Sequence, residues 1–417
     1  MSDMWKYEKL NIHCDIISGY AFASSDWEND GIPVIKISNI SNGSDVILDE
    51  STQYVNEAFG EKIDKKYRIE SGDILISLTG SHINQPNSMV GRACKNYTDK
   101  FFLLNQRAGK LIPFDNTDKN YLFYLFLTKA IKYDIVNRAY GSANQVNVSP
   151  KDIKKIKWHF PEISVQRKIS GILSNYDEMI QNNNKRINIL EQMVEELYKE
   201  WFVRFRYPGY ESDQIKNGMP QGWNIKRLSD FGRIETGKTP STADQENYGK
   251  EIMFIKTPDM ADKTIVIESE EYLSIKGHST QPKKLLPPNS IMVTCIGSGG
   301  IVAINAKEAH TNQQINSIIV KDSMKLEWLL FVCKNLKSTI EMFGSTGTTM
   351  TNLSKTKFEN LKVVCPTDRL IRMYHDFISP MLTEIKTLMY QNQNLVKQRD
   401  LLLPRLMSGK LEVKESE

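Results

Sequence analysis

Residues 164–202 read SVQRKISGILSNYDEMIQNNNKRINILEQMVEELYKEWF, and the rest of the chain is organised around this stretch. From Val165 onward a set of mostly apolar residues recurs at alternating steps of three and four, at positions 165, 169, 172, 176, 179, 183, 187, 190, 194, 197 and 201. This spacing, with one doubled step of four at Asn183, is typical of a coiled-coil helix with a single stutter. It predicts a helix about 58 Å long, which needs a partner helix to bury its apolar stripe.

A second stretch follows the same stepping rule and is the predicted partner. Its apolar positions are 370, 374, 377, 381, 385, 388, 392, 395, 399, 402 and 406, with Asn392 near the middle as Asn183 is in the first. A polar residue inside such a seam costs stability but fixes the register of the pair. We expect Pro380 to kink or restart this helix and Pro404 to end it. The alternative is two unrelated amphipathic helices, each packed on its own globular domain.

Length and composition place the chain among ordinary globular proteins. The 417 residues are enough for two or three domains, and 40% hydrophobic with 25% charged residues is not a disordered composition. The longest apolar run, at 121–127, is too short to span a bilayer, and the N-terminus lacks a signal-peptide pattern. Five scattered cysteines and six dispersed histidines predict a reduced, cytoplasmic chain without a metal site. The net charge of +4 does not by itself indicate a nucleic-acid-binding protein.

The chain also contains one globular unit written twice. WKYEKLNIHCDIISG at Trp5 reappears as WNIKRLSDFGRIETG at Trp223, and IPVIKISNI at Ile32 as IMFIKTPDM at Ile252. The strand-like GDILISLTG is answered by NSIMVTCIG, and LLNQRAGKLIP by HTNQQINSIIV. Each copy then has a helical run, a Gly-Ser turn, and a serine 12 residues before the proline that precedes a long helix. A repeat this long indicates duplicated domains rather than a solenoid.

The repeat and the helices divide the chain into six segments. We expect a first domain at 1–161, a long helix at 162–205, a linker rich in proline and glycine at 206–222, a second domain at 223–366, a second long helix at 367–410 and a tail at 411–417.

One stretch matches a nucleotide-binding motif, and the other resemblances to enzyme motifs are weaker. Residues 232–239, GRIETGKT, satisfy the P-loop pattern letter for letter. A phosphate-binding loop needs a helix that starts at the lysine, but Pro240 follows directly and a polar loop continues. We therefore interpret the match as chance. No catalytic residues are predicted, because no nucleophile–base arrangement stands out.

Several phrases resemble the specificity subunit of type I restriction–modification systems. They are PEISVQRKI at Pro161, LYKEWFVRFRYPGYE at Leu197, NGMPQGW at Asn217 and LLLPRLMSGKLEV at Leu401, and the similarity extends over essentially the whole chain. The resemblance implies an α+β architecture: two similar mixed α/β target recognition domains, held apart by two long antiparallel coiled-coil helices and related by a pseudo-two-fold axis.

The resemblance also implies a function in host defence. Each domain would read one half of a bipartite, asymmetric site in double-stranded DNA. Two modification subunits, which bind S-adenosylmethionine and methylate adenine, would dock on the helices, and restriction subunits that use ATP and Mg would join them. The chain itself would be non-catalytic and hold no cofactor, metal or membrane segment.

The residues expected to contact DNA lie in the repeated loops. Asn and Gln suit adenine, and Arg and Lys suit guanine or phosphate. In the first domain they are Lys36, Thr79, Ser81, His82, Asn84, Gln85, Arg107, Gly141, Ser142, Asn144 and Gln145; in the second they are Lys256, Ser298, Gln314, Gly344, Ser345, Thr346, Thr348 and Thr349. Tyr140 and Phe343 precede the Gly-Ser turns, and we expect them in the core, with stacking beside a flipped adenine as the alternative.

Two other functions remain open at this stage. A P-loop protein would bind ATP through Lys238, and Lys238→Ala would abolish the binding. A coiled-coil scaffold without a DNA role would use its globular units to bind proteins only. The duplicated domain argues against both.

Overall fold

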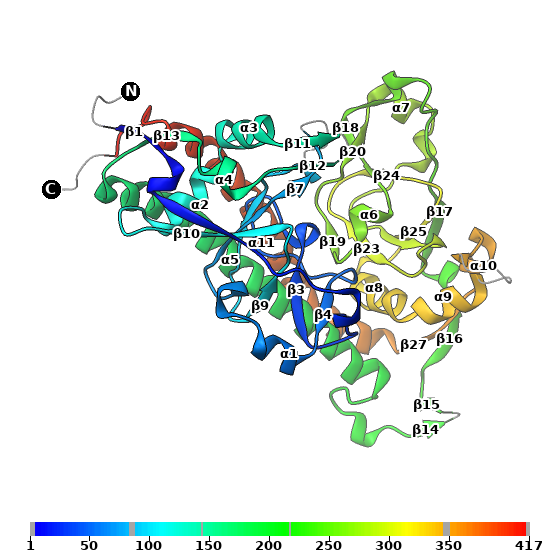
Figure 1. Cartoon of the computed structure of the whole chain (residues 1–417). Helices are drawn as coiled ribbons and strands as arrows, with labels where there is room; N and C mark the ends of the chain where they lie inside the picture. The colour runs from blue at the N-terminus through cyan, green and yellow to red at the C-terminus, as the bar shows by residue number, and fades with distance from the viewer. Residues whose placement is uncertain (1–4, 83–87, 143–144, 217, 345–350, 414–417) are drawn as a thin grey trace. The chain divides into compact units, whose positions relative to one another are not determined.

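The computed structural model describes residues 5–82, 88–142, 145–216, 218–344 and 351–413. They form two compact units. The first comprises Met1–Gln181 and Asn394–Glu417, and the second comprises Asn182–Gln393. Both units combine helices with sheets (Figure 1), as the α+β prediction requires.

The first unit contains two four-stranded sheets, a three-stranded sheet and a two-stranded ribbon. In spatial order the strands are β2 (Cys14–Ser18), β10 (Ala108–Pro113), β6 (Ile74–Ser77) and β8 (Ala93–Lys95); β4 (Gln53–Val55), β3 (Ile32–Ile35), β9 (Phe102–Leu104) and β5 (Arg68–Ile69); β11 (Tyr140–Ser142), β12 (Gln145–Asn147) and β7 (Thr79–Gly80); and β1 (Lys6–Lys9) with β13 (Lys157–Phe160).

Four short helices accompany these strands: α1 (Glu57–Lys62), α2 (Lys119–Leu127), α3 (Lys129–Arg138) and α4 (Pro150–Ile153). The α2 helix is apolar on nearly every side and packs against β8 and β10 (Figure 1). It begins at Asp118, whose carboxylate accepts a hydrogen bond from the backbone N–H of Tyr121. A buried helix of this kind is the centre of the unit's hydrophobic core.

The second unit contains the corresponding sheets. In spatial order its strands are β17 (Gly232–Thr236), β25 (Ile315–Val320), β21 (Ile291–Thr294), β23 (Val302–Asn305) and β19 (Ile265–Val266); β20 (Glu271–Leu273), β18 (Tyr248–Ile255) and β24 (Ala309–Thr311); β22 (Ile296–Gly297) with β26 (Thr351–Asn352); β16 (Asn224–Arg227) with β27 (Lys362–Cys365); and β14 (Ile215–Lys216) with β15 (Met219–Pro220). Its short helices are α6 (Thr257–Met260), α7 (Ile275–Ser279), α8 (Leu326–Asn335), α9 (Lys337–Gly344) and α10 (Lys355–Glu359).

The strand order confirms that the sequence repeat is a structural repeat. The order β2-β10-β6-β8 returns as β17-β25-β21-β23, and β4-β3-β9 returns as β20-β18-β24. In both triplets the central strand has one antiparallel and one parallel neighbour. The matched serines Ser149 and Ser354 also have one role, since each caps the N-terminus of the short helix that follows it.

Two long helices run through both units. They are α5 (Ile163–Tyr198), which continues into a π-helical turn at Lys199–Val203, and α11 (Asp368–Met407). In the second unit the amide of Asn183 donates to the Asn392 side chain over 2.9 Å, and Tyr374 Oη donates to the backbone oxygen of Val194 over 3.3 Å. Residue numbers rise along α5 as they fall along α11, so the helices are antiparallel.

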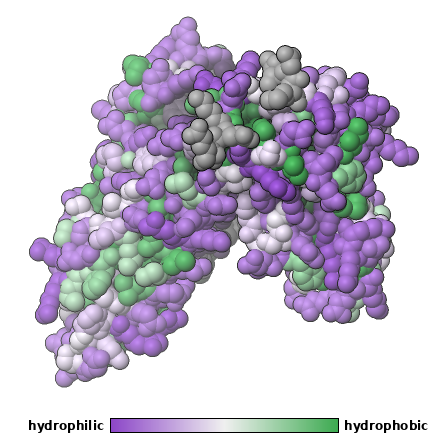
Figure 2. Space-filling model, turned by 90° about the vertical axis from the view of Figure 1, so that its left-hand side faces the viewer, coloured by the Kyte–Doolittle hydropathy of each residue, from purple (hydrophilic) through white to green (hydrophobic). Residues whose placement is uncertain are grey.

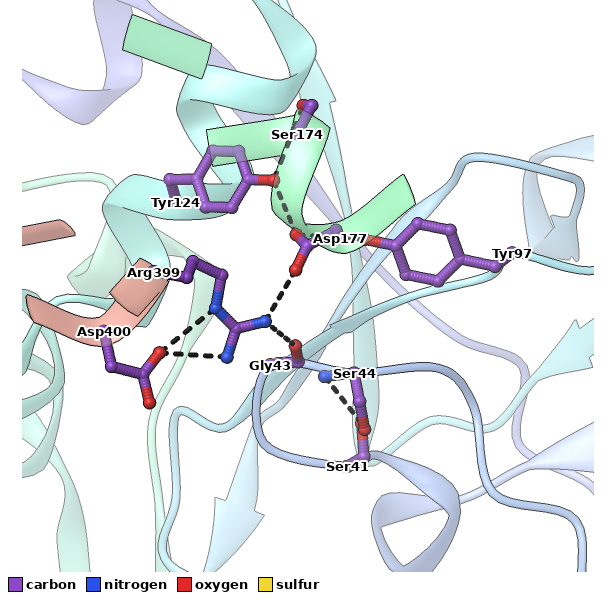
Figure 3. A network of polar contacts seen from close by, with 9 residues as sticks. All are labelled: Ser41, Gly43, Ser44, Tyr97, Tyr124, Ser174, Asp177, Arg399 and Asp400. Carbon is purple, nitrogen blue, oxygen red and sulfur yellow. Dashed lines mark hydrogen bonds and ion pairs between the residues drawn. The ribbon is translucent and has the colours of Figure 1, made fainter. Parts of the chain in front are cut away.

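In the first unit the same two helices meet at a buried ion pair. Arg399 Nη1 lies 2.6 Å from Asp177 Oδ1, and Tyr124 of α2 donates to the other oxygen of Asp177 over 2.5 Å. Figure 3 shows these side chains converging from α2, α5 and α11. The seam prediction did not include Asp177, which is 5% exposed.

The prediction that Pro404 ends the second long helix is wrong, and so is a restart at Pro380; the alternative of a kink at Pro380 stays a prediction. The α11 helix is continuous through both Pro380 and Pro404 and ends at Met407. Proline leaves the carbonyl four residues earlier without its helical partner. Those residues, Asp376 and Asp400, are exposed, so water can replace the missing hydrogen bonds. Buried apolar residues on either side of each proline hold the helix in place.

The face drawn in Figure 2 is largely hydrophilic, with separate hydrophobic patches between the polar residues. Across the described ranges, no helix combines the length and the apolar character needed to cross a bilayer.

Candidate nucleic-acid interface

In the first unit, two adjacent parallel strands bring predicted site residues to one sheet edge. Strands β3 and β9 run parallel with Ile35 opposite Leu104, and the N–H of Asn105 donates to the Ile35 oxygen over 3.1 Å. Lys36 follows β3, and Arg107 follows β9. Loops at the carboxyl ends of neighbouring parallel strands are common ligand-binding positions.

The second unit repeats this arrangement. Strands β18 and β24 are parallel with Ile255 opposite Thr311, so Lys256 and Gln314 follow their carboxyl ends. The Gln314 side-chain oxygen accepts hydrogen bonds from Thr257 Oγ1 over 3.3 Å and from Asn312 Nδ2 over 3.1 Å. These bonds fix the orientation of the Gln314 amide.

A matched glycine allows a third strand to reach the same edge. A Cβ on Gly19 would lie 2.2 Å from the Leu104 oxygen, and one on Gly237 would lie 2.1 Å from the Asn312 oxygen. Because neither residue has a Cβ, the next residues, Tyr20 and Lys238, donate their N–H groups to the strand beside them.

This packing also accounts for the P-loop-like motif. Its first five residues form the strand β17, and the next helical element after Lys238 is a single turn at Gln245–Asn247. No helix N-terminus faces a phosphate here, so the stretch is part of the sheet edge and not a nucleotide-binding loop.

Hydrogen bonds join a second group of loops to this edge. In the first unit the N–H of Leu78 donates to the Arg107 oxygen over 2.9 Å, directly before β7. In the second unit the N–H of Cys295 donates to the Gln314 oxygen over 2.7 Å, directly before β22. The β7–β12 and β22–β26 pairs are thereby attached at equivalent places. In each unit we use the name loop cluster for the residues that follow the two parallel strands together with this attached strand pair.

The predicted residues differ in how accessible they are. Arg107, Gln145 and Ser298 are exposed, and Lys36, His82, Lys256 and Gln314 are half-buried. Thr79 and Ser81 are buried and hydrogen-bonded, Thr79 to Asn147 over 2.7 Å and Ser81 to Ser88 over 2.8 Å. The Thr79 hydroxyl therefore stabilises the β7–β12 pair, and the Ser81 hydroxyl holds Ser88 beside it.

The residues of the Gly-Ser pairs that the structure describes have structural roles. Gly141 has a φ of 135°, and a Cβ there would lie 2.4 Å from the Gln145 oxygen, so the β11–β12 hairpin requires glycine. Ser142 pairs with Gln145 in the same hairpin, and Gly344 is the buried last residue of α9. The remaining candidates, Asn84, Gln85, Asn144, Ser345, Thr346, Thr348 and Thr349, lie outside the described residues.

The expectation that Tyr140 and Phe343 belong to the core is wrong. Tyr140 is 60% exposed and Phe343 is 50% exposed. Tyr140 is the first residue of β11 and Phe343 lies in the last turn of α9, so each ring is accessible to a ligand.

The matched lysines have partners that sequence reasoning missed. Lys36 Nζ donates to Gln53 on β4 and lies 4.4 Å from the centre of the Trp27 ring; burial lowers its pKa. Lys256 forms an ion pair with Glu271 on β20 and lies 5.6 Å from the Phe254 ring. No motif marks Gln53 or Glu271, because only the strand pairing places them beside the lysines.

The described residues contain no constellation typical of catalysis. No group of three or more His, Cys, Asp or Glu side chains among them is placed to hold a metal ion. All five cysteines are free and buried, and burial raises the pKa of the Cys14 thiol to about 12 and that of Cys295 to about 11. Such thiols are protonated and unreactive at neutral pH.

Comparison with known families identifies the family of the chain. The family model described as the type I restriction modification DNA specificity domain matches residues 3–192 and again residues 220–369. The chain belongs to this family. Both matches coincide with the structural repeat, so the chain carries two specificity domains and is the DNA-recognition subunit of a type I restriction–modification system. Specificity subunits are the non-catalytic members of such systems.

Individual relatives agree with this assignment. The chain is 27% identical over 413 residues to the HindI specificity subunit of Haemophilus influenzae, covering 83% of this chain and 88% of that one. It is 28% identical over 324 residues to the MjaIX specificity subunit of Methanocaldococcus jannaschii, covering 75% and 73%. The crystal structure of a type I S subunit from M. genitalium has the same fold, with a TM-score of 0.57, 15% identity and 97% of each chain covered.

Proposed function

We propose that this specificity subunit reads a bipartite, asymmetric DNA site, with one loop cluster for each half-site. The supporting observation is that the same backbone arrangement is built twice but carries different side chains. Arg107 in the first unit stands where the second has Gln314, and the two suit different bases: arginine suits guanine and glutamine suits adenine. Two clusters with different side chains favour two different half-sites.

The chain itself would act by positioning partner enzymes. Two modification subunits, which bind S-adenosylmethionine, would methylate one adenine in each half-site, and restriction subunits that use ATP and Mg would join them. Exposed apolar side chains on the long helices favour such docking. Ile189 and Met193 lie one turn apart on α5 and are 56% and 49% exposed, Phe377 on α11 is 55% exposed, and in the first unit Met179 and Leu401 are 55% and 65% exposed.

The first test is co-expression of this chain with its cognate modification subunit, followed by mapping of methyladenine in the host DNA by sequencing. The expected result is a single split motif, methylated once on each strand across a fixed gap. A complex that forms but leaves the DNA unmethylated would contradict site recognition by this chain. Failure to form any complex would contradict docking and favour a scaffold role.

A single substitution tests whether each loop cluster reads only its own half-site. Arg107→Gln is expected to relax or change the methylated sequence in one half and to leave the other half unaltered, at a cost of about 1–3 kcal/mol for the base that is read. Arg233→Gln is the matched control, because Arg233 is exposed on β17 and lies outside the loop cluster. A change in both halves with Arg107→Gln would contradict one cluster per half-site.

A further inference from the structure

Lys36 directly follows β3 and Lys256 directly follows β18, and each lysine begins a turn of the same kind. The N–H of Lys36 donates to Asn39 Oδ1 over 2.9 Å, and the N–H of Lys256 donates to Asp259 Oδ2 over 2.8 Å. In both units the turn directly follows the central strand of the triplet. The two lysine side chains therefore start from equivalent backbone positions.

The residue that faces each lysine differs in charge. Gln53 pairs with Val34 across β4 and β3, and Glu271 pairs with Phe254 across β20 and β18, so the two residues hold equivalent positions. The Lys36–Gln53 pair carries one positive charge, whereas the Lys256–Glu271 pair carries none. Both lysines lie beside an aromatic ring.

Glu271 is accessible to a ligand. Its side chain is 43% exposed and that of Lys256 is 35% exposed. It also lines an open pocket of about 570 Å³ with Tyr248, Gly249, Lys250, Glu270 and Tyr272. Phosphate groups that approach this side of the second unit would meet a carboxylate together with the lysine.

We propose that the residue facing the lysine decides whether a unit makes an ionic contact with the DNA backbone at this turn. Lys36, which faces a neutral amide, contacts a phosphate; Lys256, which is neutralised by Glu271, does not. The inference rests on the proposed function, since it needs the loop clusters to face DNA. It assigns Gln53 and Glu271 a role in setting how strongly each half-site is held.

Salt dependence measures this difference directly. Each phosphate neutralised by a protein cation contributes about −0.9 to the slope of log K against log salt concentration. The near-isosteric exchange Gln53→Glu should reduce the magnitude of the slope by about 0.9, because it neutralises Lys36. The reverse exchange Glu271→Gln should increase it by about 0.9, because it frees Lys256.

The experiment uses the full-length chain in complex with its modification subunits. Binding to a labelled duplex that carries the methylated motif is followed by fluorescence anisotropy over a range of KCl concentrations. Two controls, Gln221→Glu and Glu211→Gln, change the net charge equally at exposed positions outside the loop clusters. Both should leave the slope unchanged, and thermal unfolding verifies that every variant is folded.

A double variant distinguishes a direct contact between Lys36 and a phosphate from a general effect of the protein's net charge. If Lys36 makes the contact, Lys36→Gln reduces the magnitude of the slope by about 0.9, and adding Gln53→Glu reduces it no further. Additive effects, or slopes that move equally with the controls, would overturn the inference. If the wild-type complex does not prefer the motif over a scrambled duplex, the proposed function itself fails; if it does prefer the motif but the exchanges do not shift the slope in opposite directions, only this inference fails.

Discussion

The two units hold the same pair of helices by different chemistry. In the first unit Leu173 and Leu406 join the hydrophobic core, and a buried polar network centred on Asp177 and Arg399 is added to this packing; Tyr124 and the oxygen of Gly43 also take part in it (Figure 3). Burial opposes the charge on Arg399, but the attraction of Asp177 and Asp400 outweighs it and raises the Arg399 pKa.

In the second unit the attachment is an aromatic cluster. Tyr374 on α11 is fully buried and meets Tyr198, Trp201 and Phe202 with ring centres 5.0–6.4 Å apart. Polar contacts accompany it, among them the Asn183–Asn392 bond over 2.9 Å and the contact of His375 with the buried Glu327 over 2.7 Å. Apolar packing of this kind is tolerant of small shifts.

The difference teaches how a duplicated fold can keep its topology while changing what stabilises it. Hydrogen bonds and ion pairs are directional, and a buried charge without its partner is costly, so the first unit allows one helix register. The second unit gains its stability from area and shape. Single substitutions should therefore act more sharply in the first unit.

The largest effect is expected from Asp177→Asn. It removes the buried one of the two carboxylates that pair with Arg399 and leaves only the exposed Asp400; breaking a buried pair costs about 3–5 kcal/mol. Hydrogen exchange measured by mass spectrometry should show faster exchange in peptides of the first unit, and urea unfolding should show the lost stability.

Asp400→Asn is the control for this variant, because Asp400 also pairs with Arg399 but is 57% exposed. Its cost should stay below about 1 kcal/mol. Equal effects of the two variants would contradict the view that burial decides the strength of this network.

A matched pair of Tyr→Phe variants compares the two attachments with one chemical change. Tyr124→Phe removes a hydrogen bond to a carboxylate and should cost about 1.5–3 kcal/mol. Tyr374→Phe removes a 3.3 Å bond to a backbone oxygen and keeps the ring packing, so it should cost about 0.5–1.5 kcal/mol. Urea unfolding of both variants tests the order, and the reverse order would contradict the contrast between the units.

Acid sensitivity is expected to be greater in the second unit. His310 on β24 is fully buried, with its Nε2 atom 3.0 Å from Nδ1 of His278. Burial and, to a smaller extent, the charge of His278 lower the pKa of His310 from 6.5 to about 4. Since folding favours the neutral ring, the stability is present above pH 6.5 and is lost as the pH falls toward 4. Between pH 7.5 and 5.0 the loss should be about 2 kcal/mol.

The first unit has a buried histidine of its own that serves as the comparison. Burial lowers the pKa of His13 too, but its bond to Glu8 opposes the shift, so its acid loss should be smaller. His310→Gln should flatten the pH dependence of peptides from the second unit, followed by hydrogen exchange. An unchanged pH dependence in that variant would show that other groups are responsible.

The sequence predicted the architecture well because the repeat and the helical spacing are local patterns. It failed where a helix packs on more than one partner. The seam included Met179 and Phe377, which are each 55% exposed, while their neighbours Asp177 and Ile378 are buried. A heptad pattern assumes a single partner helix, but α5 and α11 also pack on the sheets and helices of each unit, so other faces are buried.

The candidate site was predictable only in part. Alignment of the two copies identified Lys36 with Lys256 and Arg107 with Gln314. It did not show that Lys36 and Arg107, or Lys256 and Gln314, follow neighbouring strands at one sheet edge, because this depends on which strands are parallel neighbours. Gln53 and Glu271 lie 17 and 15 residues after their lysines and belong to no motif. Their importance follows from cross-strand pairing, which the spacing of residues does not reveal.

The smallest effect is expected at an exposed ion pair whose N–O distance equals that of the buried Arg399–Asp177 pair. Arg186 Nη2 lies 2.6 Å from Glu384 Oε1 in the second unit, the same distance as in the Arg399–Asp177 pair. The side chains of Arg186 and Glu384 are 55% and 41% exposed, however, against 10% and 6% for Arg399 and Asp177. Water screens the exposed pair, so Glu384→Gln should cost only about 0.2–1 kcal/mol, and less in high salt. Urea unfolding at low and at high KCl measures this cost and its dependence on salt. A cost near that of Asp177→Asn would mean that distance, rather than burial, sets the strength of these ion pairs.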